Sequence, residues 1–213
     1  MIGATATQGQ PVAKRGFRVG LPDGFIELPL DEVDVESTEL ETLVSAVRQR
    51  FGMSADDVVA ETATSFAAMG ELIGRSGVDY AAVAFYGSPD DPLRSIMMTL
   101  TGTALPSDHT SEIQAVTELH NLHGSSSKYE TVEGLRLPAG PAVATVAEER
   151  SAVEFGGSSS DVITRQLSAW IPDREGTTVG VISASTNSFQ DWEHVCVLAL
   201  DIFETFEWEP ING

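Results

Sequence analysis

The chain has 213 residues, of which 32 are acidic and 12 are basic, so its formal net charge is −20. This charge argues against nucleic-acid binding, because proteins that bind nucleic acids neutralise phosphates with clustered Lys and Arg. It argues equally against docking on anionic membrane surfaces. The length favours one large domain, and an apolar fraction of 42% is that of a globular protein.

The cysteine content and the hydropathy pattern bear on the compartment. Cys196 is the only cysteine, so an intrachain disulfide is excluded. Residues 1–16 lack the apolar core of a signal peptide. No apolar run reaches the length of about 18 residues that indicates a membrane span. The sequence therefore predicts a cytoplasmic protein without membrane insertion, and it leaves the oligomeric state open.

The first part of the chain predicts a hairpin after an unstructured start. Residues 1–15 are expected to be a disordered lead-in, and residues 16–210 a single domain. Short alternating runs at 17–21 and 25–30 flank a Pro-Asp-Gly turn, a pattern typical of a β-hairpin. Pro29 cannot donate to a strand ladder, so the second run should end there or lie at a sheet edge.

Two helices are predicted next, behind a run of carboxylates. Thr38 and Glu41 have capping-box spacing, and apolar positions then recur at helical intervals until Gly52. Ser54 and Asp57 have the same spacing and predict the start of a second helix, which should extend to about Ile73.

The rest of the chain is predicted to be mostly strands. Residues 78–86 and 96–103 are β-rich, and a helix is expected over 111–123. Further strands are expected at 129–137, 141–148, 151–156, 162–171 and 177–185. The final helix, 191–207, should bury Val195, Ala199, Ile202 and Phe206 on one face. This order predicts the α+β class, with an antiparallel sheet and flanking helices forming an α/β/α sandwich.

Two stretches carry a resemblance to a known family. The opening run 24–29, and the ending formed by 162–171, 177–185 and the last helix, resemble PsbP-like domains, a group that includes LpqN-type lipoproteins. The resemblance implies an antiparallel sheet with helices on both faces, and a function in binding rather than catalysis. It implies no functional residue.

Three of the four histidines cluster and raise an alternative function. His120 and His123 could share one helix face, as metal ligands do, and His109 lies nearby. Such a site would make the chain a small-molecule- or metal-binding, hydrolase-like domain. The segment is not His-Glu-x-x-His, however, and a histidine near a helix C-terminus is also favourable without any metal.

The leading hypothesis is a non-catalytic protein-interaction domain that needs no cofactor. No nucleophile elbow and no phosphate-binding loop occurs in the sequence. The run Asp31, Glu32, Asp34 and Glu36 is a candidate docking face for a protein partner, which a basic surface would suit. Trp192 and Trp208, near the two ends of the last helix, are expected either in the core or at the rim of a binding surface.

Overall fold

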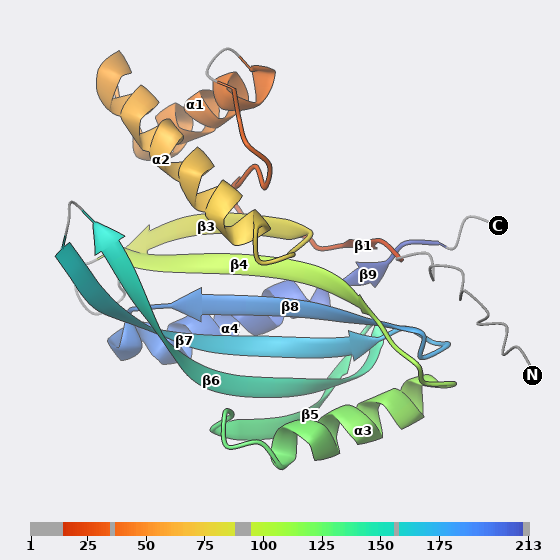
Figure 1. The fold of residues 1–213 in the computed structure, drawn as a ribbon. Coiled ribbons are helices and arrows are strands. Elements are labelled where there is room, and N and C mark those ends of the chain that lie inside the picture. Colours follow the sequence, from red (N-terminus) through yellow and green to blue (C-terminus); the bar gives the residue numbers. More distant parts are fainter. Residues whose placement is uncertain (1–14, 35–36, 88–94, 156–157, 211–213) are drawn as a thin grey trace, which may run out of the picture.

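A computed structural model describes residues 15–34, 37–87, 95–155 and 158–210 (Figure 1). The elements in chain order are β1 (Phe17–Arg18), β2 (Phe25–Glu27), α1 (Thr38–Phe51), α2 (Asp56–Gly74), β3 (Tyr80–Gly87), β4 (Ser95–Pro106), α3 (Glu112–Gly124), β5 (Thr131–Leu137), β6 (Gly140–Phe155), β7 (Ser158–Pro172), β8 (Thr178–Thr186), the 3-10 turn η1 (Phe189–Asp191), α4 (Trp192–Glu204) and β9 (Glu207–Trp208).

Seven strands form one antiparallel sheet in the order β2-β3-β4-β8-β7-β6-β5, and β1 pairs with β9 in a separate two-stranded sheet. The predicted α+β class and antiparallel sheet are confirmed. The strands predicted at 141–148 and 151–156 are one strand, β6, because its ladder with β7 continues through Glu149 and Arg150. β2 lies at the sheet edge and ends before Pro29, as predicted.

The predicted hairpin at the start of the chain is wrong. β1 pairs with β9, so that Phe17 lies opposite Trp208. β2 pairs instead with β3, and Ile26 lies opposite Val83. β1 and β2 therefore belong to two different sheets, because each pairs with a strand from a distant part of the chain.

Three helix ends differ from the prediction. The side chain of Ser37, not Thr38, caps α1 by accepting from the Leu40 amide at 3.2 Å. α2 begins after Ala55, without a side-chain cap from Ser54. α4 ends at Glu204 rather than 207, because the Gly20 amide donates to Thr205 Oγ1 at 2.8 Å and the next residues pair with β1.

The helices cover both faces of the sheet. α4 packs on one face, where its Val195, Ala199 and Ile202 are buried as predicted, together with Phe206 just beyond its end. α1 and α2 enclose a second cluster with β2 and β3 on the other face. The strand registers place Trp170, which contacts α3, on the same face as Ala81 of that cluster. Figure 1 shows α4 behind the sheet and α3 in front of it.

Candidate functional site

The segment that leads to the acidic run packs closely on α2. A Cβ built on Gly70 would lie 2.1 Å from the Pro29 carbonyl oxygen, and one on Gly74 would lie 2.1 Å from the Leu30 carbonyl oxygen. These two glycines lie one turn apart on α2, so the backbone of 29–30 can run against the helix where larger residues would block it. Asp31 follows directly from this close packing.

The described carboxylates of the acidic run face solvent. Asp31, Glu32 and Asp34 are all exposed, and no ion pair joins them to any residue that the structure describes. Glu36, the fourth residue of the predicted docking face, lies outside the described residues. Glu39 and Glu41 continue the negative charge into the first turn of α1, where carboxylates are favourable.

The three clustered histidines are not brought together as ligands. His109 pairs with Glu118 at 3.6 Å, His120 is exposed, and His123 is buried in the last turn of α3. Within the described ranges, no group of three or more His, Cys, Asp or Glu side chains is arranged to hold a metal ion.

His123 packs between two aromatic rings. Its imidazole lies 4.8 Å from Tyr129 and 4.3 Å from Trp170, measured between ring centroids. Its Nε2 is buried and has no hydrogen-bond partner in the described part of the chain. Burial lowers the pKa of His123, and the nearby Lys128 ammonium lowers it further. The residue is therefore placed as a neutral imidazole of the core.

Trp192 and Trp208 lie at opposite ends of α4 and line separate pockets. The ring of Trp192 is covered by the Arg165 guanidinium at 4.9 Å, and that guanidinium also pairs with Glu130 at 2.6 Å. Trp192 and Arg165 line a pocket of about 380 Å³, together with Phe189 and His194. Arg165 is thus already neutralised within its own surroundings.

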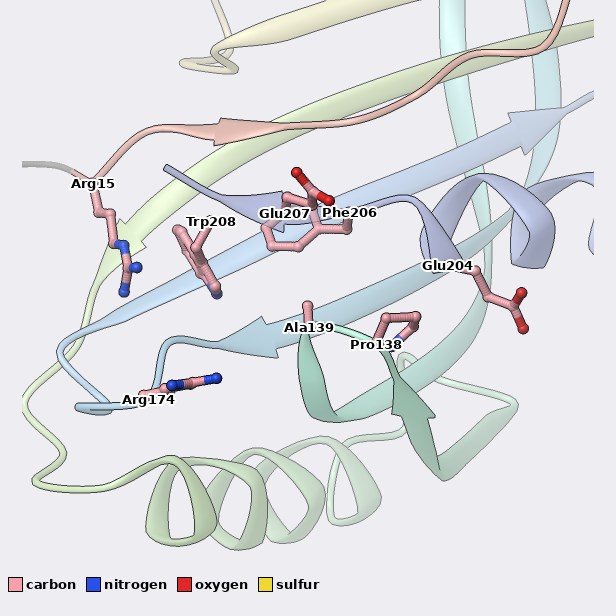
Figure 2. A pocket seen from close by; sticks show the side chains of 8 residues that line it. All are labelled: Arg15, Pro138, Ala139, Arg174, Glu204, Phe206, Glu207 and Trp208. Carbon is pink, nitrogen blue, oxygen red and sulfur yellow. The ribbon is translucent and has the colours of Figure 1, made fainter. Parts of the chain in front are cut away.

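Trp208 lines a pocket of about 340 Å³ (Figure 2). That volume lies at the small end of the range of ligand sites. Two guanidinium groups, two carboxylates and an apolar surface line it, contributed by Arg15, Pro138, Ala139, Arg174, Glu204, Phe206, Glu207 and Trp208. These residues come from four places in the chain: the segment just before β1, the β5–β6 turn, the β7–β8 turn, and the segment from the end of α4 to β9.

The pairing of the chain's ends positions one side of this pocket. The Glu209 amide donates to the Gly16 carbonyl at 3.0 Å, which extends the β1–β9 pairing. Arg15, the last residue of the predicted lead-in, donates from Nε to the Glu209 carbonyl at 2.9 Å. Its guanidinium also lies 5.3 Å from the centre of the Trp208 ring.

A tight turn between β7 and β8 positions the other side. Asp173 is buried, and its carboxylate accepts from the Thr177 amide at 2.9 Å and from Arg15 Nη1 at 3.4 Å. Gly176 has a φ of +74°, and a Cβ there would meet the Ser111 backbone at 2.7 Å. The turn thus holds Arg174 at the mouth of the pocket.

Sequence reasoning singled out Trp208 as a candidate for the rim of a protein-binding surface, but it missed both arginines of this pocket. Arg174 lies in a turn that the sequence does predict, yet a turn residue has no local feature that reveals a pocket. Arg15 is separated from Trp208 by nearly the whole chain, and only the unpredicted β1–β9 pairing brings them together.

Comparison with known proteins finds likeness among solved structures alone. No family model matches the chain, and no curated protein matches it. Among solved structures, it is similar to LpqN of Mycobacterium tuberculosis, described as involved in cell envelope biogenesis. The two share 13% identity at a TM-score of 0.42, over 95% of this chain and 88% of that one. Membership of the PsbP-like group stays a prediction. None of the helices in the described part of the chain is long and apolar enough to cross a membrane.

Proposed function

We propose that the chain is a non-catalytic interaction domain that binds a basic protein partner through an acidic surface, defined as Asp31, Glu32 and Asp34 with Glu39 and Glu41 of α1. The observation that carries this proposal is that these carboxylates are exposed and that no described cation neutralises them. A negative surface of this kind attracts a positive partner and speeds its encounter.

The anchoring of this surface supports the same function. Its first residue follows the backbone that is packed on Gly70 and Gly74, and the cap at Ser37 sets the start of α1 within it. A charged surface that is held in place loses less conformational entropy on binding than one on a free tail. A cytoplasmic location stays a prediction, as does the absence of a cofactor.

The test measures association rates with a partner that is captured from native lysate, identified and purified. At about 0.15 M salt, charges interact over about 8 Å, and at 1 M over about 3 Å. We expect the association rate to fall steeply between these conditions. The variant Asp31→Asn, Glu32→Gln, Asp34→Asn should associate at least about fivefold more slowly at low salt, because it removes three steering charges.

A matched control separates this surface from bulk charge. Glu133→Gln, Glu193→Gln and Asp201→Asn remove the same charge from exposed positions on β5 and α4. This control should associate at nearly the native rate. A salt-independent rate, or equal slowing in both variants, would contradict the proposal that the acidic surface docks the partner.

A further inference from the structure

The pocket in Figure 2 contains a cation that no described carboxylate pairs with. Carboxylates outnumber Lys and Arg by 32 to 12, and most of the described cations pair with one. Arg174 is exposed at the mouth of the pocket, and it pairs with no carboxylate among the residues that the structure describes. In so acidic a chain, this leaves a positive charge available to a ligand.

Two further donor groups converge on the same space. Arg15 uses Nε and Nη1 in its hydrogen bonds to Glu209 and Asp173, and a guanidinium carries five N–H donors, so others stay available. Trp208 Nε1 is buried, and no described residue forms a hydrogen bond with it. Figure 2 shows this indole nitrogen pointing into the space that the two arginines bound. A buried donor without a partner costs free energy, and an oxygen ligand would remove that cost.

The opposite wall of the pocket is apolar. Pro138 and Ala139 from the turn between β5 and β6 face the aromatic pair of Phe206 and Trp208, whose rings meet edge to face at 5.2 Å. Phe206 is completely buried and belongs to the core beneath α4. Phe206 therefore supports the Trp208 ring from behind, while Pro138, Ala139 and Trp208 supply the accessible surface for an apolar group.

We propose that this pocket binds a small monocarboxylic acid, with the carboxylate on Arg15, Arg174 and Trp208 Nε1 and its apolar body on the wall of Pro138, Ala139 and the Trp208 ring. Guanidinium groups suit carboxylates because their paired N–H donors match the two oxygens. This site lies outside the acidic surface of the proposed function. The two proposals are therefore independent, and each is tested by its own experiment.

The surrounding charges favour a monoanion over a phosphate. Asp173 already pairs with Arg15, and Glu204 and Glu207 also line the pocket, with carboxylates that point away from the two arginines in Figure 2. These carboxylates therefore offset part of the positive charge of the two arginines. A dianion would meet more repulsion from these carboxylates and from the chain's net charge of −20 than a monoanion would.

The experiment titrates the full chain with benzoate and with N-acetylphenylalanine, which present the same carboxylate as a free acid and as a peptide end. Benzamide and inorganic phosphate serve as the neutral and the dianionic comparisons. Binding is followed by the indole N–H signals in ¹H–¹⁵N NMR spectra, where the chain's three tryptophans give three resonances. The signal of Trp208 is assigned by its loss in Trp208→Phe.

We expect the two carboxylates to shift the Trp208 signal, and benzamide and phosphate to leave it in place. Arg174→Gln should weaken binding at least about tenfold, as expected for the loss of a charged hydrogen bond. The control Arg136→Gln removes an exposed arginine that pairs with no described carboxylate and lies outside the pocket, and it should bind as the native chain does. If benzoate binds more tightly, the natural ligand is a free acid. If N-acetylphenylalanine binds more tightly, the ligand is the carboxyl end of a peptide.

Two results would overturn the proposal. One is that neither carboxylate shifts the Trp208 signal at millimolar concentration. The other is that Arg174→Gln and Arg136→Gln weaken binding equally, which would mean that general charge, rather than the pocket, attracts the anion. Because Arg174 is exposed on a turn and makes no side-chain bond to a described residue, its replacement should leave the fold intact.

Discussion

Gly70→Ala is expected to destabilise the domain, although helix propensity alone predicts the opposite. Alanine is favoured over glycine inside a helix by about 1 kcal/mol. In α2, however, the new Cβ would lie 2.1 Å from the Pro29 carbonyl oxygen and 3.0 Å from Leu28 Cβ, where ordinary contacts begin at 3.4 Å. The backbone of Pro29 would have to move by more than 1 Å, from 2.1 to at least 3.4 Å.

The size of the effect follows from how little that backbone can yield. Leu28 is buried in the cluster under α1 and α2, and its amide donates to the Ala81 carbonyl at 2.9 Å. Overpacking a close-packed site costs about 1–3 kcal/mol, and this site lies at the upper end because the obstacle is backbone whose φ is locked by the proline ring. After the gain in helix propensity is subtracted, we expect a net loss of about 1–2 kcal/mol.

Urea unfolding followed by far-UV circular dichroism measures this change. The matched control is Gly124→Ala at the end of α3, where a Cβ would meet no atom of the described residues within 4 Å. It should stabilise the domain by about 0.4–1 kcal/mol, because alanine restricts the unfolded chain. If Gly70→Ala is as stable as the native chain, or if the two variants shift in the same direction, the close packing of 29–30 on α2 is wrong.

Three other predictions concern the core, the pH dependence and metal. Ile202→Ala should cost about 2–5 kcal/mol in the same unfolding assay, because the side chain is buried beneath α4; a loss below about 0.5 kcal/mol, typical of surface positions, would contradict its placement. The pKa of His123 is lowered by burial, so the unfolded chain takes up its proton first, and stability should fall as the pH drops below about 6.5 and level off below the folded-state pKa. The slope should reach at most about 1.4 kcal/mol per pH unit, and it should shrink in His123→Gln but not in His120→Gln; equal slopes in all three proteins would refute it. A chelator should leave the melting temperature unchanged, whereas a drop that zinc restores would revive the histidine site.

The sequence by itself determined the elements whose signal is local. The face of α4 was predicted because Val195, Ala199 and Ile202 recur at helical spacing, and a helix must bury such a stripe. The strands β4, β7 and β8 were predicted from β-rich runs between turn residues. The acidic run was visible for the same reason, since it is a property of consecutive residues. Its anchoring on Gly70 and Gly74 was not visible, because the backbone that those glycines admit belongs to another segment.

Only the tertiary structure decided which strands pair and where a pocket opens. Phe17 and Phe25 lie in similar short runs on either side of a turn, and nothing local distinguishes a hairpin from two strands with distant partners. Pairing between β1 and β9 depends on the closing entropy and packing of the whole chain rather than on either segment's pattern. The β1–β9 pairing and the β7–β8 turn bring together Arg15, Arg174 and Trp208. Because these residues are far apart in the sequence, no local pattern predicts the pocket that they line.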